Sequence, residues 1–364
     1  MPELLDRLSD HLRARADEAP AVALLQPAEP FLDTVGEAMR RRLFVTEDEH
    51  GTSLCLRPEF TIPLCLHHIE SDSFVGTSYA GVGTVFRQER EAGDAAEFPQ
   101  AGIEFLGHSN AARIDVAALD AMLDALTVAG VPDPAVTLGD KALFTALVGS
   151  LGLSASWQNR LARAFGDAAA LETLAAELAS PPADAPGSDE ERWAIDGEVE
   201  RLETHVRDLM RAGGLSPTAG RDPAVIAERA VERARDARQR LEPFALHVLR
   251  SFLALDQPLD AALRSLETLG QQADIDWQGT LEALRDRADA LDAGALRFRA
   301  GFGRPLDYYT GLLFEARLPG EGGVAVAGGG RYDRLCTMLG ADAPVKAVGF
   351  TITVDRLPGF RRGG

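Results

Sequence analysis

Hydrophobic residues recur at two spacings along this chain, and the changes of spacing divide it into three blocks. Helical spacing opens the first block, set by Leu4, Leu5, Leu8 and Leu12. Short apolar or aromatic runs, bounded by glycine, proline or charged residues, then predict strands at 53–56, 79–86 and 103–106. A helix is predicted over 114–126. We therefore expect residues 1–140 to form a sheet that is crossed by few helices.

The second block, residues 141–290, is rich in alanine, leucine, arginine and glutamate, and its spacing predicts helices. Proline and glycine interrupt it at 181–187 and again at 213–223, as expected for linkers between helices. Strand-like sequence resumes after residue 291, in ALRFRAGF, LLFEARL, GGVAVAGGG and KAVGFTI. The pattern predicts an α+β protein in which 1–140 and 291–364 form one discontinuous core and 141–290 form a mainly helical insertion.

Composition narrows the classes of protein that fit. The 364 residues exceed what one ordinary core organises, and 46% hydrophobic with 26% charged residues is typical of a packed globular chain. The 37 Lys and Arg against 56 Asp and Glu leave a formal charge of -19, which repels nucleic-acid phosphates. We therefore expect neither nucleic acid nor membrane as a partner.

Three cysteines, Cys55, Cys65 and Cys336, cannot all pair with one another, and no CxxC spacing indicates a zinc site. The N-terminal segment carries Glu3 and Asp6 where a secretion signal would have a basic start and an apolar run. Both observations favour the reducing cytoplasm. The adjacent His67 and His68 lack a second cluster of ligands, so we expect no metal site.

The octapeptide LRPEFTIP, residues 56–63, is the first candidate for ligand binding. Pro58 ends a strand, and the turn after it presents Glu59 and Thr61, whose oxygens can accept hydrogen bonds from an ammonium group. A surface turn that caps the next helix explains the same residues.

The segment FPQAGIEFLG, residues 98–107, is the second candidate, and it follows TVFRQER, which contains Arg87. Alternation along a strand places Gln100 and Glu104 on one face, where they can line a pocket. The alternative is that this face is the solvated side of the sheet.

The third candidate is GRPLDYYTGLLFEARL, residues 303–318, followed by AGGGRYDRL. Arg304 offers a planar fork for a carboxylate or phosphate. Tyr308 and Tyr309 point to opposite faces if the segment is extended, so we expect only one of them in a given pocket. Glycines 328–330 permit close backbone approach, although a tight turn or a bulge explains them equally well.

Taken in order, LRPEFT, FRQER, FPQAGIE, RPLDYYTGLLFE, AGGGRYD and AVGFTITVDRL resemble the catalytic domain of class II histidyl-tRNA synthetases. The resemblance implies a largely antiparallel sheet flanked by helices, a helical insertion, and a homodimer formed around QPAEPFLD. Three departures stand out. Thr353 occupies a position where the synthetases have a glycine beneath adenine, the loop EAGDAAE is acidic, and the chain ends at Gly364 without an expected anticodon-binding domain.

These departures make the chain more similar to the regulatory subunits of ATP phosphoribosyltransferase, a paralogous family. The implied partner is the short-form catalytic subunit of that enzyme, within a hetero-oligomer, and the implied ligand is histidine. The resemblance implies no catalytic residue and no cofactor. Contacts to the α-amino group are expected from Glu59, Thr61 and Gln100, contacts to the carboxylate from Arg87 and Arg304, and contacts to the imidazole from Glu104 and one of Tyr308 or Tyr309.

Two alternatives remain open from the sequence. A shortened histidyl-tRNA synthetase, or an enzyme that activates histidine with ATP, would use Arg87, Arg304 and Arg356 to face ATP. A scaffold without any ligand would need none of these residues.

Overall fold

The computed structural model describes residues 2–71, 75–88, 95–180, 187–214, 222–290, 296–304, 308–320 and 322–360. It divides into two compact units, one formed by 1–146 and 252–364, the other by 147–251. The expected helical insertion, 141–290, is longer than the second unit, because α13 (Leu259–Ala273) and α14 (Gln278–Ala290) fall within the first. Helical periodicity shows that a helix forms, but it does not show to which of the two compact units the helix belongs.

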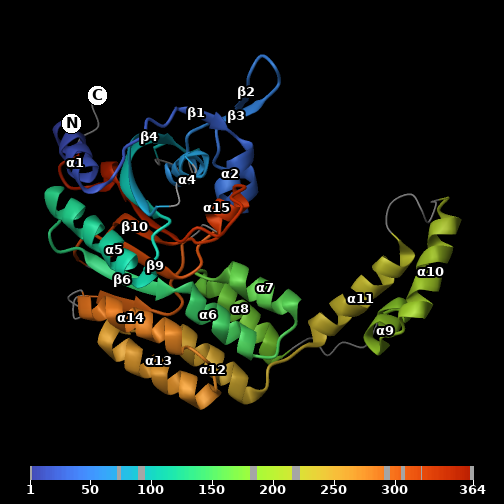
Figure 1. The fold of residues 1–364 in the computed structure, drawn as a ribbon. Helices are drawn as coiled ribbons and strands as arrows, with labels where there is room; N and C mark the ends of the chain where they lie inside the picture. Colours follow the sequence, from blue (N-terminus) through green and yellow to red (C-terminus); the bar gives the residue numbers. More distant parts are fainter. Residues whose placement is uncertain are drawn as a thin grey trace. The chain divides into compact units, whose positions relative to one another are not determined.

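The first unit is built on an eight-stranded sheet with the order β4-β5-β11-β10-β9-β6-β8-β7. Strands β4, β10, β9 and β6 of this sheet are labelled in Figure 1. Its strands are β4 (Thr77–Phe86), β5 (Glu97–Leu106), β11 (Ala347–Thr353), β10 (Ala325–Arg331), β9 (Leu312–Arg317), β6 (Ala135–Asp140), β8 (Leu296–Arg299) and β7 (Asp256–Pro258). Neighbours pair antiparallel except β6 and β8, which are parallel. The predicted α+β class and the predicted strands are confirmed, and β7 is a strand that the helical composition around it concealed.

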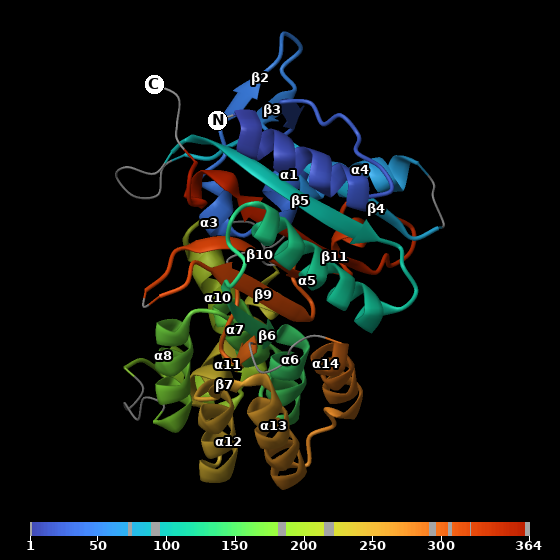
Figure 2. The ribbon, with the colours of Figure 1, turned by 90° about the vertical axis from the view of Figure 1, so that its left-hand side faces the viewer.

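Helices cover both faces of this sheet. On one face, α1 (Pro2–Arg15) and α5 (Ala111–Val128) pack against the strands and against each other, as Figure 2 shows. On the other face lies α4 (Thr61–Glu70), next to α15 (Leu335–Met338). The remaining short helices of this unit are α2 (Glu29–Thr34), α3 (Glu37–Arg40) and the 3-10 turn η2 (Val354–Arg356).

A second, three-stranded sheet has the order β1-β3-β2 and is antiparallel throughout. Its strands are β1 (Leu25–Pro27), β2 (Val45–Glu47) and β3 (Ser53–Leu56). Leu24, just before β1, Leu25 of β1 and Val45 of β2 are each at least half exposed, and the register places Leu25 and Val45 on opposite faces of the sheet. Pro58 follows β3 and leads the chain into α4.

A buried ionic cluster joins three elements of the first unit. Asp115 of α5 is fully buried and pairs with Arg287 of α14, and its other oxygen lies 2.5 Å from Arg331 of β10. A buried charge needs such partners, because removing it from water is costly. The cluster holds α5, α14 and β10 in a fixed relation.

The second unit is helical, with α7 (Ala155–Ala164), α8 (Ala168–Ala179), α9 (Asp189–Asp196), α10 (Val199–Ala212) and α11 (Pro223–Arg238). Two further helices, α6 (Lys141–Ser150) and α12 (Pro243–Leu253), cross its boundaries with the first unit. Side-chain caps begin several of these helices, as where the carboxylate of Asp222 accepts from the backbone of Ala224.

Candidate functional site

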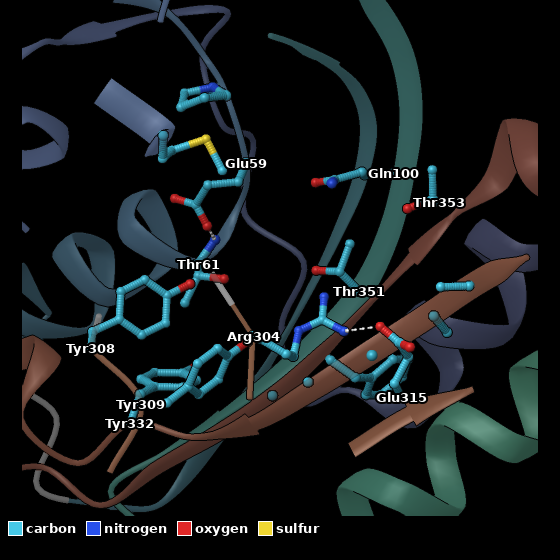
Figure 3. Close-up of a pocket in the computed structure, with 18 of the residues that line it drawn as sticks. Glu59, Thr61, Gln100, Arg304, Tyr308, Tyr309, Glu315, Tyr332, Thr351 and Thr353 are labelled. Carbon is cyan, nitrogen blue, oxygen red and sulfur yellow. Dashed lines mark hydrogen bonds and ion pairs between the residues drawn. The ribbon is translucent and has the colours of Figure 1, made fainter. Parts of the chain in front are cut away.

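The face of the sheet that α4 covers contains a cavity of about 380 Å³ (Figure 3). Its lining includes all eight residues expected from the sequence, Glu59, Thr61, Arg87, Gln100, Glu104, Arg304, Tyr308 and Tyr309. They come from three separate parts of the chain: the turn into α4, strand β5 with the residue that follows β4, and the segment before β9. The fold therefore brings the three candidate motifs together around one space.

Glu59 closes one wall and also caps α4. Its two carboxylate oxygens accept from the backbone N–H groups of Thr61, at 2.6 Å, and Ile62, at 2.9 Å. A carboxylate at this end is stabilised by the helix dipole, whereas burial raises the pKa of Glu59. The capping role that the sequence left open is thus present, but the turn is buried and lines the cavity.

Glu104 lies at the centre of a second set of hydrogen bonds. Thr61 Oγ1 donates to one of its carboxylate oxygens at 2.6 Å, and the hydroxyl of Tyr332 donates to the other. Burial raises the pKa of Glu104 to about 8 despite these two donors. The group is therefore largely protonated at neutral pH, so it can offer a donor as well as an acceptor to a ligand.

Two polar atoms in the lining have no hydrogen-bond partner among the described residues. They are Oε1 of Gln100, an acceptor, and Nε of Arg304, a donor. The Arg304 guanidinium lies 3.6 Å from the carboxylate of Glu315 through its Nη1. Buried polar atoms are almost always paired, so an unpaired acceptor and an unpaired donor in one cavity indicate a polar ligand.

Arg87 follows β4 and adds a second positive charge. Its Nε donates to the carbonyl of Pro58 at 2.9 Å, and its guanidinium lies over the ring of Phe98. Removal of the guanidinium from solvent lowers the pKa of Arg87 to about 10, and the nearby Glu59 opposes this shift. The side chain remains a cation at neutral pH.

The expectation that only one of Tyr308 and Tyr309 faces the cavity is wrong. Both are buried and both line it, with ring centroids 5.1 Å apart. The reason is that β9 begins only at Leu312, so the tyrosines lie outside the strand and strand alternation does not apply to them. In Figure 3 the three rings of Tyr308, Tyr309 and Tyr332 gather on one side of the cavity, with Gln100 and Thr353 on the other.

Glycines in the strands make room for the charged side chains. A Cβ atom at Gly349 of β11 would lie 1.5 Å from the Glu104 carboxylate, and one at Gly328 of β10 would lie 1.8 Å from the Arg304 guanidinium. The run 328–330 is thus part of a strand and serves close approach, one of the explanations that the sequence allowed.

Two residues of the site were not predicted from the sequence. Tyr332 falls within the AGGGRYD motif without an expected role, and Glu315 lies within LLFEARL. Strand alternation and motif order give no direct sign that Tyr332 would reach Glu104. Thr353, by contrast, was singled out from the sequence because the synthetases have a glycine at its position. It lines the same cavity, as does Arg356.

The described residues contain no group of three or more His, Cys, Asp or Glu side chains arranged to hold a metal ion. His68 instead lies 3.0 Å from the hydroxyl of Tyr79 through its Nδ1.

No helix among the described residues is long and apolar enough to cross a membrane. Residues 91–94 of the acidic loop EAGDAAE, which spans 91–97, lie outside the described residues.

Chemically, the cavity offers complements to an amino acid. Carboxylate and amide oxygens suit an ammonium group, two guanidinium groups suit a carboxylate, and Glu104 with three tyrosines surrounds a place for a flat polar ring.

Comparison with known proteins shows the family to which the chain belongs. The family model for histidyl-tRNA synthetase matches residues 3–215 and 203–357. A curated protein of Mesorhizobium japonicum, named ATP phosphoribosyltransferase regulatory subunit, is 46% identical over 99% of this chain and 98% of its own length. One of the same name from Sinorhizobium medicae is 47% identical over 92% and 90%. The chain belongs to the family of ATP phosphoribosyltransferase regulatory subunits.

Solved structures similar to this family member confirm its fold. A Bacillus halodurans chain, described as an ATP phosphoribosyltransferase regulatory subunit/histidyl-tRNA synthetase, superposes with a TM-score of 0.65 at 19% identity, covering 99% of this chain and 79% of that one. Histidyl-tRNA synthetase from Nostoc sp. PCC 7120 gives 0.61 at 16% identity, with 97% and 69% covered. The predicted class II synthetase-like architecture is therefore confirmed.

Proposed function

We propose that this chain is a non-catalytic subunit that binds free histidine in the cavity and acts in the cytoplasm on a short-form ATP phosphoribosyltransferase catalytic subunit. In this proposal the catalytic subunit requires the chain for full activity, and histidine signals through it. The binding of a ligand is supported chiefly by two atoms without a hydrogen-bond partner, Gln100 Oε1 and Arg304 Nε, in a cavity that Glu104 also lines. The identity of the partner is supported by the names of the relatives.

In the proposed pose, the ammonium group lies against Gln100 and the Glu59–Thr61 turn, and the carboxylate faces Arg87 and Arg304. The imidazole lies beside Glu104 and the tyrosines. A neutral imidazole has one donor and one acceptor nitrogen, and a carboxyl group with a pKa of about 8 can satisfy either.

Calorimetry with histidine tests the ligand. We expect binding to the wild-type chain and a loss of about one to two decades of affinity in Glu104→Gln, since the amide places an NH2 group where the carboxyl group has an oxygen, and a buried polar atom left without its hydrogen-bond partner costs about 1–3 kcal/mol. Glu97→Gln, at an exposed position of the same strand, is the matched control. Equal affinities in the wild type and Glu104→Gln would place the site elsewhere.

Mixing with the catalytic subunit from the same organism tests the partner. Phosphoribosyl transfer should be slow with the catalytic subunit alone and faster after the chain is added. Histidine should reduce the rate of the mixture, and this effect should weaken in Arg304→Ala. A mixture that is no faster than the catalytic subunit alone would contradict the regulatory role.

We also propose a homodimer formed through the region of β1 and α2. The exposed Leu24 and Leu25, at the β1 edge of the three-stranded sheet, support this, because apolar side chains of this size favour burial against a partner. Sedimentation should give twice the mass of the chain, and Leu25→Glu should reduce it to one. A wild-type monomer at micromolar concentration would refute this part.

A histidine-activating enzyme is the second candidate, favoured by the synthetase family model and by Arg87, Arg304 and Arg356 in one cavity. Histidine-dependent exchange of pyrophosphate into ATP separates the two functions, because only an activating enzyme catalyses it. We expect none, since the Thr353 side chain occupies the cavity wall where the synthetases leave space for adenine.

A further inference from the structure

Two of the three cysteines lie together beneath the cavity. Cys65 is in α4 and Cys336 is in α15, two helices that pack against each other, and both side chains are fully buried. The two thiols lie close enough for each to shift the pKa of the other. The third, Cys55, is also buried but lies on β3 of the smaller sheet.

The pair sits directly behind the groups that hold Glu104. Cys65 is one helical turn after Thr61, and Cys336 is four residues after Tyr332, whose carbonyl accepts from the backbone of Leu335 at the start of α15. Thr61 and Tyr332 are the two donors to the Glu104 carboxylate. A change in the separation of the two sulfur atoms therefore acts on both donors at once.

We propose that Cys65 and Cys336 form a reversible disulfide bond that alters how Glu104 is held in the cavity. An S–S bond of about 2.05 Å is far shorter than a contact between two thiols, so α4 and α15 must shift toward each other when it forms. Tight packing passes such a shift to the neighbouring side chains.

The oxidant is a two-electron oxidant of the peroxide class. The sulfur of Cys336 attacks a peroxide oxygen, an S–O bond forms as the O–O bond breaks, and the departing oxygen takes up a proton and leaves as water. The Cys65 sulfur then attacks the oxidised sulfur, the S–S bond forms, the S–O bond breaks, and a second water leaves. In total, two thiols and hydrogen peroxide give one disulfide and two waters.

The environment supports this order of events. The nearby Cys65 thiol lowers the pKa of the Cys336 thiol, which increases its share of the reactive thiolate, while burial raises the pKa of Cys65. Burial likewise raises the pKa of Cys55 to about 11. Cys55 is thus a buried thiol from the same chain that serves as an internal control.

Peptide mapping tests the bond on the intact chain. After treatment with hydrogen peroxide, remaining thiols are alkylated under denaturing conditions, and the chain is cut after glutamate and after lysine or arginine. The three cysteines then fall on different peptides, 50–59, 60–70 and 335–346. We expect 60–70 joined to 335–346, reversal by dithiothreitol, and the same product in Cys55→Ser. Full alkylation of both peptides at every peroxide dose, or equal linkage of Cys55, would overturn the proposal.

The effect on the cavity rests on the proposed binding of histidine. Oxidised wild-type chain should bind histidine on the order of five-fold more weakly than reduced chain, a modest coupling between two sites. Oxidation should have no effect in Cys336→Ala. A joined peptide with unchanged affinity would refute the coupling to Glu104, whereas absence of binding in both forms would instead refute the proposed function and leave the bond itself established.

Discussion

Replacement of Glu104 by glutamine should change how the stability of the first unit depends on pH. Glutamine has nearly the same shape and keeps an oxygen that accepts a hydrogen bond, but it does not ionise. The hydroxyls of Thr61 and Tyr332 can each donate or accept, so both find a partner in the variant. The comparison therefore isolates the charge.

The expected size follows from the pKa of this carboxyl group in the unfolded and folded chain. A glutamate exposed to water has a pKa of 4.5, and burial raises that of Glu104 to about 8, so between these values the folded chain holds a proton that the unfolded chain has lost. Stability then falls as pH rises, by about 1.4 kcal/mol per pH unit, and the loss is complete above the folded pKa. From about pH 5.5 to about pH 8.5, Glu104→Gln should gain up to about 3 kcal/mol relative to the wild type.

Urea unfolding measures this difference, provided the signal comes from the first unit alone. Of the three tryptophans, only Trp277 belongs to that unit, and it is buried. Its fluorescence should therefore be followed in a background with Trp157→Phe and Trp193→Phe. The exposed Glu97→Gln should leave the pH profile unchanged.

Burial also raises the pKa of Glu59, and that of Asp140 to about 6, so the wild-type profile alone does not identify Glu104. The difference between variant and wild type removes their contribution. If the free energy of unfolding depends on pH in the same way in the wild type and in Glu104→Gln, the pKa of Glu104 is not raised. If the stability advantage of the variant becomes smaller as pH rises, the pKa of Glu104 is lowered instead.

Three further changes have defined outcomes. Gly328→Ala should displace the Arg304 guanidinium and weaken histidine binding about ten-fold by calorimetry, and combining it with Arg304→Ala should add little, since both act on one contact. Thr353→Gly should strengthen ATP binding at least about ten-fold in equilibrium dialysis, because the overpacking it relieves typically costs about 1–3 kcal/mol; unchanged binding would refute this role. Asp115→Asn should lower the stability of the first unit by about 3–5 kcal/mol, since it removes the buried negative charge that Arg287 and Arg331 share and leaves Arg331 with Asp333 as its ion-pair partner. Asp120→Asn, in an exposed ion pair, should change it by less than about 1 kcal/mol.

Strand periodicity located part of the site because it depends only on local geometry. Gln100 and Glu104 are four residues apart in β5, so any regular strand places them on one face, and burial by α4 makes that face a cavity wall. The same rule failed for Tyr308 and Tyr309, because it was applied to a segment outside the strand.

Other features depend on neighbours that are remote in sequence. The clearance that Gly349 gives to Glu104 exists because β11 pairs with β5 in a register that sets these two residues opposite each other. The contact of Tyr332 with Glu104 likewise joins residues separated by 228 positions. No local pattern carries such information, nor does it show that α13 and α14 pack with the sheet.

Glu59 and Gln100 face the same cavity under unequal constraints. The Glu59 carboxylate already accepts hydrogen bonds from two backbone groups of α4, so a substitution there loosens a helix as well as the proposed ligand contact. The Gln100 Oε1 atom makes no hydrogen bond within the described chain, so a replacement there alters recognition with little penalty to folding. Over evolutionary time, descendants of this protein that acquire a new effector should therefore diverge first at position 100, while position 59 stays acidic.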